Sequence, residues 1–358
     1  MEDLVNMLDF NIYKDKKVFL TGHTGFKGTW MLRWLKMLGA EVKGYALNPL
    51  NDFDLYHSIN ADSFCESIIN DIRDRSFLIE EVRKFQPDFI FHMAAQPLVR
   101  LSYELPAETF EVNVIGTANL LDALKFVDKH CACIIATTDK VYHNREWQYP
   151  YRENDRLGGY DPYSASKAAA ELLVSSYRNS FFNQNDFESH KKSISTARAG
   201  NVIGGGDWAK DRIIPDIVRS LRQNETIKIR NPKSVRPWQH VLEPISGYLQ
   251  LAAQMYKSPI KYDGEWNFGP NIGDNLTVEE IVQKAIQIWG KGNYLANSDL
   301  RQPHEAGLLK LDISKAQNEL AWHPKLKADE AISWTIDFYK SDSPSEMIRK
   351  QIEAYQII

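Results

Sequence analysis

Short apolar segments alternate with longer amphipathic ones through the first half of this chain, and this alternation limits the folds that it can adopt. Apolar runs of strand length lie at 17–21, 41–47, 87–92, 132–137 and 193–198. Amphipathic segments of helical length lie between them, at 29–38, 76–85, 106–127 and 163–177. Strands that alternate with helices predict βαβ units, and right-handed crossovers then give a doubly wound parallel sheet. We therefore expect an α/β fold.

The composition is that of an ordinary globular protein and excludes several classes of function. Of the 358 residues, 43% are hydrophobic and 25% charged, and 43 basic against 47 acidic side chains leave a net charge of −4. This balance predicts neither disorder nor a nucleic-acid surface, although a local basic patch for an anionic small molecule stays open. Cys65, Cys131 and Cys133 make neither a disulfide framework nor a four-ligand zinc site. Without a signal-peptide pattern or an apolar run of about 20 residues, we expect a cytoplasmic protein with no membrane or metal partner.

A glycine-rich turn follows the first predicted strand. Residues 21–28 have the spacing G-x-x-G-x-x-G and open the first amphipathic helix. Glycines let the backbone turn tightly and let a pyrophosphate approach the helix N-terminus, whose free N–H groups attract anions. Such a triplet alone is weak evidence, but between a buried strand and a helix it predicts a dinucleotide site. The residues expected to bind the dinucleotide here are Gly22, Thr24, Gly25, Phe26 and Gly28.

The end of the second predicted strand bears on which dinucleotide is bound. An acidic residue there binds the ribose of NAD, whereas an arginine nearby accommodates the additional phosphate of NADP. The strand ends at 45–48 with the sequence YALN and carries neither. The choice therefore stays open and leans to NAD. Asp71 and Ile72, after another short apolar stretch, either contact the adenine edge or belong to a solvated loop.

Beyond about residue 200 the alternating pattern loosens. Turns containing glycine or proline lie at 204–207, 231–233 and 269–271. Amphipathic helices are predicted at 215–222, 244–255 and 278–289. We predict a dinucleotide-binding domain over 1–200 and a smaller, mixed α/β and mainly substrate-binding lobe over 201–358, with some segments returning to the first domain. The ligand crevice should lie at the carboxyl ends of the parallel strands, beneath that lobe.

A tyrosine and a lysine share one face of the helix predicted at 163–177. Tyr163 and Lys167 are four residues apart, so they stand one helical turn from each other. A tyrosine with a reference pKa of about 10 is a poor base at neutral pH, but an adjacent ammonium and an oxidised nicotinamide both favour the phenolate. Such a phenolate can take the proton of a sugar hydroxyl while hydride leaves the same carbon. Downstream of a dinucleotide turn, the pair predicts an oxidation centre rather than an ordinary helix face.

At these residues the chain resembles the extended short-chain dehydrogenase/reductase family. The matching segments are the turn at 21–28, HMAAQ at 92–96, Asn113, TTD at 137–139, YSASK at 163–167, RAGNV at 198–202, RPWQHV at 236–241 and NFGP at 267–270. Within that family it is similar to the nucleotide-sugar 4,6-dehydratases, in particular those that act on CDP-glucose. The resemblance implies a Rossmann domain with NAD as the cofactor. It also implies cofactor contacts at Ala94, Ala95, Thr137, Tyr163 and Lys167.

The segment Thr138-Asp139-Lys140 separates a dehydratase from an epimerase in this resemblance. It follows a predicted sheet strand, so its side chains should reach the crevice. Epimerases of the family carry a small hydroxyl residue in this stretch and need only hydride transfer and rotation of the sugar, whereas a dehydratase also needs an acid and a base. Similar dTDP-glucose dehydratases have Asp followed by Glu, and the CDP-glucose enzymes have Asp followed by Lys. A surface ion pair after a strand is the structural alternative.

The resemblance implies a net dehydration by a hydro-lyase in four steps. Tyr163, sharing a hydrogen bond with Thr138, deprotonates the glucose 4-hydroxyl while NAD accepts hydride from C4. The 4-ketone acidifies the C5 hydrogen, which Lys140 or a water that it positions removes, and Asp139 protonates the departing C6 hydroxyl. Hydride returns to C6 and C5 is reprotonated. To act as a base, Lys140 must be neutral. Its reference pKa of about 10.4 opposes this unless burial or nearby cations lower the pKa. Lys140 therefore acts either as the base or as a cation beside an enolate.

A nucleotide diphosphate needs cations and amide donors. Asn201 and Arg236 match family positions that bind the diphosphate, Asn267 lies in another matching segment, and Arg212 and Arg301 are weaker candidates. Trp238 and His240 either pack around the nucleotide or belong to the core. The prediction that the nucleotide base is cytosine rests on the resemblance alone. So does the prediction that the protein acts in bacterial dideoxysugar or O-antigen synthesis.

Two further expectations concern assembly and alternative functions. In similar enzymes the helices equivalent to 106–127 and 163–177 form a bundle between subunits, so a homodimer is expected, with a tetramer as the alternative. A nucleotide-sugar 4-epimerase is disfavoured by Asp139-Lys140, and an inverting UDP-N-acetylglucosamine dehydratase by the 23 positions from Lys140 to Tyr163. A dinucleotide sensor without activity would have lost the Tyr–Lys pair.

Overall fold

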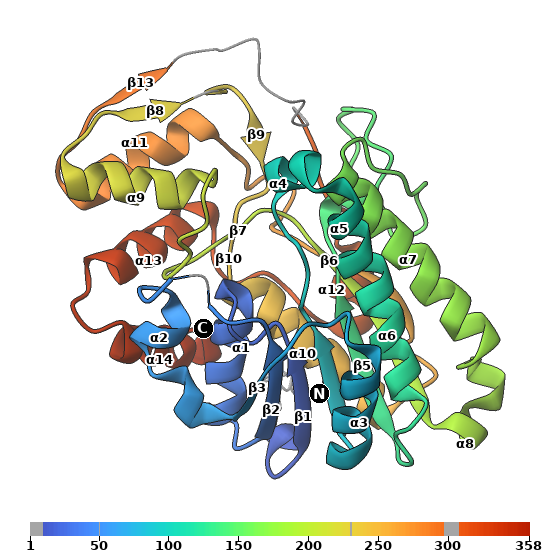
Figure 1. Ribbon diagram of the computed structural model, residues 1–358. Coiled ribbons are helices and arrows are strands. Elements are labelled where there is room, and N and C mark those ends of the chain that lie inside the picture. The colour runs from blue at the N-terminus through green and yellow to red at the C-terminus, as the bar shows by residue number, and fades with distance from the viewer. Residues whose placement is uncertain (1–9, 50, 230, 297–307) are drawn as a thin grey trace, which may run out of the picture.

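One parallel sheet organises the chain (Figure 1). A computed structural model describes residues 10–49, 51–229, 231–296 and 308–358. Among these, seven parallel strands follow the order β11-β6-β5-β4-β1-β2-β3. Their bounds are β1 Lys17–Thr21, β2 Glu41–Ala46, β3 Glu66–Ile69, β4 Phe89–His92, β5 Cys131–Ala136, β6 Lys192–Ala199 and β11 Gly264–Phe268. The strand order reverses between β1 and β4, which confirms the doubly wound sheet and places its switch point beside the glycine turn.

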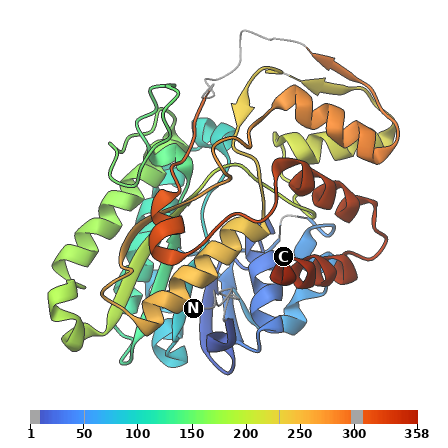
Figure 2. The ribbon, with the colours of Figure 1, turned by 180° about the vertical axis from the view of Figure 1, so that it is seen from behind.

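Helices cover both faces of the sheet because successive side chains of each strand point to opposite sides. On β1, Phe19 belongs to the apolar cluster with α3 (Arg75–Phe85), α6 (Gly116–Leu124) and α7 (Pro162–Ser180). Its neighbours Val18 and Leu20 belong to the opposite cluster, with α1 (Phe26–Met37) and α10 (Leu242–Lys257). The view from behind shows α10 lying across that second face (Figure 2). A near-continuous apolar strand is what a sheet covered on both sides requires.

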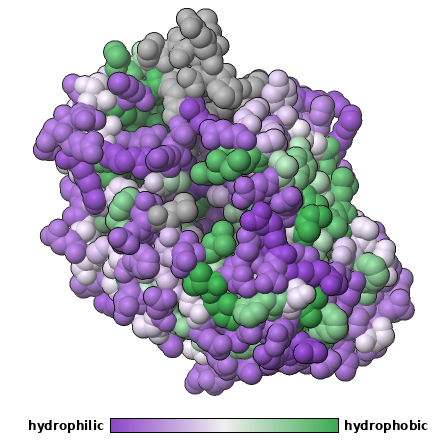
Figure 3. All heavy atoms as spheres, viewed as in Figure 1, coloured by the Kyte–Doolittle hydropathy of each residue, from purple (hydrophilic) through white to green (hydrophobic). Residues whose placement is uncertain are grey.

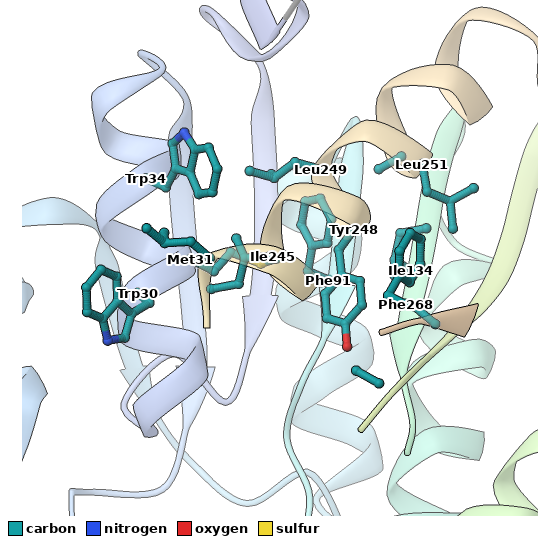
Figure 4. Packing of buried hydrophobic residues seen from close by; sticks show 14 of the residues in the cluster. Trp30, Met31, Trp34, Phe91, Ile134, Ile245, Tyr248, Leu249, Leu251 and Phe268 are labelled. Atoms are coloured by element: carbon teal, nitrogen blue, oxygen red, sulfur yellow. The ribbon is translucent and has the colours of Figure 1, made fainter. Parts of the chain in front are cut away.

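The cluster between α1, α10 and the sheet holds the two lobes together. Trp30 and Trp34 of α1 are fully buried, and Ile245 and Leu249 of α10 belong to the same cluster (Figure 4). The indole N–H of Trp30 donates to the carbonyl oxygen of Gly205 at 2.9 Å, so the first helix is tied to a segment that follows β6. This hydrogen bond and the apolar cluster fix the smaller lobe against the carboxyl edge of the sheet, where the glycine turn follows β1.

The smaller lobe has an apolar core of its own. It contains α9 (Ile213–Gln223), α11 (Val278–Trp289) and α13 (Ala328–Lys340), with short strand pairs β10–β7, β12–β9 and β13–β8. The bounds of those strands are β7 Val202–Ile203, β8 Ile227–Ile229, β9 Val235–Arg236, β10 Gln239–His240, β12 Leu276–Thr277 and β13 Tyr294–Ala296. The chain after residue 201 thus builds this lobe and also supplies α10 and β11 to the large sheet. We propose a two-lobed organisation on this basis, with the substrate lobe interrupted by 242–268.

Most predicted elements are present with their ends shifted by a few residues. The helix expected at 106–127 is divided into α5 (Pro106–Phe110), a π-helical turn (Glu111–Ile115) and α6. The π turn brings Asn113 inward, where it is fully buried. The remaining helices are α2 (Leu55–Ser58), α4 (Val99–Glu104), α8 (Phe187–His190), α12 (Ser314–Leu320) and α14 (Pro344–Ile357). In the described part of the chain, none of the helices combines the length and the apolar character that crossing a membrane would require.

Candidate active site

The glycine turn is forced by the space around it. Gly22 has a φ of +74°, and a Cβ there would lie 2.7 Å from the backbone nitrogen of Ala94. At Gly28 a Cβ would lie 2.0 Å from the carbonyl oxygen of Gly22. Both positions therefore exclude a side chain, and the turn brings the start of α1 against the segment that follows β4. Gly25 forms the N-cap of α1 with extended backbone and no side-chain cap.

These features fit a dinucleotide. Because no side chain caps α1, its first N–H groups are available to a pyrophosphate, and the missing Cβ atoms give the backbone room to approach it. Thr24 donates its hydroxyl hydrogen to the carbonyl oxygen of Leu47 at 2.8 Å, which joins the turn to the end of β2. Phe26 is half-buried beside Gly204 of the smaller lobe. The predicted cofactor residues of the turn thus lie together at the switch point of the sheet.

The segment after β4 is fixed by a buried polar network. The hydroxyl oxygen of Thr21 accepts the N–H groups of Met93 and Ala94, both at 3.1 Å, and lies 2.7 Å from His92 Nδ1. Burial lowers the pKa of His92 to about 3, so the ring is neutral and serves this network. Ala94 and Ala95 follow, half-buried at the carboxyl edge. Asn113 secures the same segment, accepting from Gln96 N–H at 2.9 Å.

The candidates for the adenine edge lie in different surroundings. Asp71 pairs with Arg73, with Oδ2 and Nη2 2.6 Å apart, and this guanidinium lowers the pKa of the carboxyl group. Ile72 is buried against Gly116 of α6, where a Cβ would lie 2.6 Å from Ile72 Cγ2. Both follow β3 at the carboxyl edge, but the side chain of Asp71 is already engaged by the protein.

The end of β5 presents the acid–base candidates. Thr138 donates its hydroxyl hydrogen to Asp139 Oδ1 at 3.0 Å, and the Lys140 ammonium lies 3.9 Å from the same oxygen. Asp139 is 3% exposed, whereas the Lys140 side chain is 31% exposed. A carboxylate this deeply buried is not a surface ion pair, so the structural alternative for this pair does not hold. The short 3-10 turn Asp139–Val141, capped by Thr138, keeps the three side chains at the mouth of the sheet.

Helix α7 places the tyrosine and the lysine beside them. The helix starts where Asp161 accepts the N–H of Ser164 at 2.9 Å and Pro162 occupies the first turn, a common N-terminal arrangement. Tyr163 is 9% exposed and hydrogen-bonds Thr138 through its hydroxyl. Lys167 is 8% exposed, and its ammonium donates to the carbonyl oxygen of Ala136 at 3.3 Å.

Burial opposes the charge of both groups. It raises the pKa of Tyr163 to about 12, and the two groups that lower it most are Thr138 and Arg212. The Lys167 ammonium, which the sequence analysis expected to favour the phenolate, donates to the Ala136 carbonyl. Burial lowers the pKa of Lys167 to about 8. In both cases burial favours the neutral form of the side chain.

Beneath this pair lies a buried ion pair that the sequence analysis did not single out. Glu171 and Arg198 are each 1% exposed, with Arg198 Nη2 2.8 Å and Nε 2.9 Å from the two carboxylate oxygens. Thr137, predicted as a cofactor contact, donates its hydroxyl hydrogen to Glu171 at 2.5 Å. Its side chain therefore faces this ion pair. Glu171 stands one helical turn after Lys167, a periodicity that could have indicated it.

The candidates for substrate binding are only partly brought together. Arg212 precedes α9 and pairs with Asp207 at 2.8 Å, within electrostatic range of Tyr163. Asn201 follows β6, and the half-buried Arg236 lies on β9 of the smaller lobe. Arg301 lies outside the described residues.

Asn267 is not brought to the crevice. It is fully buried, and its amide donates to the carbonyl oxygens of Tyr151 and Asp312 while accepting from the Tyr142 hydroxyl. All of its hydrogen-bonding groups are used inside the protein, which a motif match could not reveal. His240 is likewise a core residue, fully buried with its pKa lowered to about 3 by burial.

Two further side chains that were not predicted lie close to each other. Lys27 stands in the first turn of α1 between two predicted cofactor residues, and its ammonium lies 5.6 Å from the centre of the Tyr248 ring on α10. Both are within electrostatic range of Asp139. The sequence signal for Lys27 was a basic side chain inside the glycine turn. No local sequence pattern indicates Tyr248, because it lies on α10, far from the glycine turn in the chain.

The chain is similar to known proteins over most of its length. A family model described as GDP-mannose 4,6 dehydratase matches residues 19–335. A CDP-glucose 4,6-dehydratase of Salmonella typhimurium is 50% identical over 336 residues, which cover 94% of this chain and 93% of that protein. A CDP-paratose 2-epimerase of Salmonella typhi is 26% identical and covers 91% of this chain and 99% of its own length.

A likeness to solved structures supports the fold. The crystal structure of DesIV, a dTDP-glucose 4,6-dehydratase from Streptomyces venezuelae with NAD and TYD bound, is 22% identical and matches with a TM-score of 0.75. The match covers 91% of this chain and 97% of that chain. Together with the extent of the family match, these similarities show that the chain belongs to the GDP-mannose 4,6 dehydratase family, among the extended short-chain dehydrogenase/reductases.

Proposed function

We propose that the chain is a CDP-glucose 4,6-dehydratase, a hydro-lyase that converts CDP-glucose to CDP-4-keto-6-deoxyglucose and water with NAD as its cofactor. The observation that carries the proposal is the cluster of Thr138, Asp139 and Lys140 beside Tyr163 and Lys167. It combines an oxidation centre with an acid–base pair. The 50% identity over 94% of the chain supports CDP-glucose as the substrate, whereas GDP-mannose dehydratases such as that of Drosophila melanogaster are 25% identical.

The residues around the glycine turn hold the cofactor in this proposal. The first N–H groups of α1 bind the pyrophosphate, and Lys167 orients the nicotinamide ribose. NAD, when held there, would supply the hydride acceptor for C4 of the glucose and the hydride donor for C6. Tyr163 takes the proton of the 4-hydroxyl at its phenolic oxygen, with Thr138 as its hydrogen-bond partner. Because burial raises the pKa of Tyr163 to about 12, the positive charge of the oxidised nicotinamide is needed to make this transfer favourable.

Asp139 and Lys140 carry out the elimination. The 4-ketone acidifies the C5 proton. Lys140 either removes this proton at its amine, directly or through water, or remains a cation and stabilises the enolate that forms when the proton is lost. Asp139 gives its proton to the C6 hydroxyl oxygen as the C6–O bond breaks, and water leaves. Thr138 contacts both Tyr163 and Asp139, so the proton taken from the 4-hydroxyl has a hydrogen-bonded path back to Asp139.

The smaller lobe provides the nucleotide site in this proposal. Arg236 and Asn201 bind the diphosphate, with Arg212 close to Tyr163 as a further cation. All three lie on segments that follow β6. Figure 3 shows the face of the molecule hollowed below the smaller lobe, where this substrate would lie.

The outer face of α5 to α7 supports a homodimer. Its exposed apolar side chains are Leu105, Phe110, Ile115 and Leu172, with exposed fractions between 37% and 61%. Green, hydrophobic residues gather over these helices on the right of Figure 3. Monomers rarely expose a contiguous apolar patch of this kind. We further place the enzyme in the cytoplasm and in dideoxysugar synthesis for lipopolysaccharide, both from the family resemblance.

The direct test is turnover of the purified chain with CDP-glucose and added NAD. The 4-keto-6-deoxy product is followed by its near-ultraviolet absorbance in alkali, with dTDP-glucose, UDP-glucose and GDP-mannose run in parallel and Tyr163→Phe as the inactive control. Signal with CDP-glucose alone is expected. Signal only with another nucleotide sugar would keep the chemistry and remove the substrate, and silence with all four would remove the dehydratase.

A further inference from the structure

An ion pair connects the two lobes beside the candidate active site. The guanidinium of Arg100, on α4, lies 3.2 Å from the carboxylate of Asp211, in the segment that leads into α9 (Nη1 to Oδ1). Helix α4 follows β4 of the large sheet, whereas α9 belongs to the core of the smaller lobe. In Figure 1, α4 and the smaller lobe lie next to each other above the sheet. None of the roles described above uses this pair.

The helix that carries the arginine is bonded directly to the reaction centre. Ser102, two residues after Arg100 and fully buried, accepts the backbone N–H of Tyr163 at 3.1 Å. The start of α4 is fixed as well, because the side-chain oxygen of Gln96 accepts the N–H of Leu98 at 2.6 Å. Helix α4 is therefore a fixed wall of the site, and Arg100 lies on it.

The aspartate belongs to a short segment that is anchored in the smaller lobe. The hydroxyl of Tyr339, on α13, donates to the carbonyl oxygen of Asp207 at 2.5 Å, and the Asp207 carboxylate pairs with Arg212 at 2.8 Å. Asp211 has a φ of +61°, in the left-handed region that aspartate and asparagine tolerate better than most residues. The segment 207–212 thus forms a compact loop. It carries Arg212, a proposed cation of the substrate site, and places Asp211 beside α4.

The two lobes are held together differently at the α1 and α10 contact and at α4. The apolar cluster of α1 and α10 and the hydrogen bond from Trp30 to Gly205 are buried, so they form a permanent contact. The side chains of Arg100 and Asp211 are 30% and 42% exposed, so water screens their attraction and the pair breaks at little cost. A crevice that is fixed at one contact and closed by a weak ion pair at another can admit a ligand and then retain it.

We infer that the Arg100–Asp211 pair is a latch, which holds the smaller lobe against α4 while the nucleotide sugar is bound and opens to admit substrate and release product. For the identity of that substrate the inference rests on the proposed function. It assigns both residues to the retention of the nucleotide sugar and to no step of its chemistry. Loss of the pair should therefore weaken binding and leave the rate of the bound complex unchanged.

The test compares Arg100→Gln and Asp211→Asn with the wild-type holoenzyme. Each variant removes one charge, and asparagine accepts the left-handed backbone at position 211. We expect KM for CDP-glucose to rise about threefold in both variants, while kcat stays within about twofold. The ratio of each KM to that of wild type should approach one at about 1 M salt, where the pair is screened. The charge-reversed variant Arg100→Glu/Asp211→Lys should recover the wild-type KM, and Lys191, with a φ of +55°, shows that a lysine adopts the same backbone region in this chain.

Hydrogen–deuterium exchange of the substrate-free chain tests the latch without turnover. Backbone amides over 207–216 should exchange about threefold faster in both single variants and at the wild-type rate in the charge-reversed variant. Lys284→Gln is the matched control, because the Lys284 side chain is 33% exposed and pairs with Asp329 at 2.7 Å between two helices of the smaller lobe. It should behave as wild type in both measurements.

Three results would count against the latch. Wild-type KM and wild-type hydrogen exchange in Arg100→Gln would overturn it, and so would a defect that charge reversal does not repair. A loss of activity of about 100-fold or more in Arg100→Gln, with a normal Asp211→Asn, would make Arg100 a ligand of the substrate instead. If the wild-type chain does not convert CDP-glucose, the proposed function fails, and the hydrogen-exchange measurement still decides whether the latch exists.

Discussion

Lys167 has an unfavourable position for a charged side chain. It is 8% exposed, and its ammonium donates a hydrogen bond to a backbone carbonyl 3.3 Å away. Burial lowers its pKa to about 8, from an ordinary 10.5. Burying such a group lowers the stability of the folded protein, and active sites commonly lower stability because their function requires such groups.

The cost of burying Lys167 can be measured through its pH dependence. Below about pH 8 the lysine is protonated in both the folded and the unfolded state, so the whole penalty is present. Between pH 8 and 10.5 the unfolded state binds more protons, so wild-type stability rises with pH. We expect Lys167→Met to be inactive yet more stable than wild type at pH 7, by about 3 kcal/mol. This gain should shrink at pH 10 in urea unfolding of the cofactor-free protein, and a loss of stability at pH 7 would contradict the argument.

Asp139 is expected to act after the oxidation of C4. Asp139→Asn has nearly the same shape but cannot give a proton to the C6 hydroxyl. We expect kcat to fall by about 100-fold or more, with NADH accumulating in a single turnover. Stopped-flow absorbance at 340 nm measures this accumulation, with Asp186→Asn, in the exposed segment before α8, as the control. Wild-type turnover of Asp139→Asn would exclude it as the acid.

Lys140 can act as a base or as a cation, and one pair of variants separates these roles. Lys140→Ala should still oxidise C4 but should no longer exchange the C5 hydrogen with solvent deuterium. Lys140→Arg keeps the charge and lacks a usable base, so it should restore exchange only if the cation is what matters. Mass spectrometry of recovered CDP-glucose and product gives the deuterium content. Normal exchange in Lys140→Ala would leave this residue with neither role.

At the scale of single elements, local patterns could be read from the sequence and distant contacts could not. The glycine turn and the Tyr163–Lys167 pair each lie within one turn or one helix, so the spacing of their residues in the sequence was enough to predict them. The Thr138-Asp139-Lys140 group could be predicted to lie at the site from the rule that the carboxyl ends of parallel strands meet at one edge of the sheet. Asn267 was mistaken for a crevice residue because its partners come from 142–151 and 312. Lys27 and Tyr248 meet across two helices more than 200 residues apart in the chain.

The Glu171–Arg198 pair joins α7 to β6 and so fixes the helix that carries the tyrosine. Both side chains are 1% exposed, and removing one leaves the other buried without a counter-charge. We expect Glu171→Gln to lower the free energy of unfolding by about 3 kcal/mol and to reduce kcat, because α7 loses its fixed position. Urea denaturation measures the stability change.

An exposed pair provides the control for that prediction. Arg349 and Glu353 lie 2.7 Å apart on α14, with 41% and 48% of their side chains exposed. Glu353→Gln should change stability by less than about 0.5 kcal/mol, since water screens such pairs. Equal effects of the two substitutions would mean that burial of the Glu171–Arg198 pair is not what stabilises α7.

The whole molecule follows from one property of a doubly wound sheet. All seven strands point the same way, so the turns after β1, β4, β5 and β6 meet at one edge. This is why residues from 22 to 201 could be predicted to share a site. The sequence analysis expected some segments after residue 200 to return to the first domain, but it could not show that 242–268 is one of them, because α10 and β11 follow a stretch of the smaller lobe and their partners lie far back in the chain. That return brings Tyr248 to the site.

The same arrangement leaves the outer face of α5 to α7 without a partner in one chain. Leu172, 61% exposed on α7, is near the middle of this helix and cannot turn inward, because Val174 and Glu171 already face the interior. If two chains pack through this face, a charge at position 172 is buried against apolar side chains in both and destabilises the dimer. We expect Leu172→Glu to be monomeric at micromolar concentration, where wild type is dimeric, by light scattering after gel filtration. Ile260→Glu, at a residue 53% exposed beyond the end of α10, should stay dimeric, and a Leu172→Glu chain that remains dimeric would place the interface elsewhere.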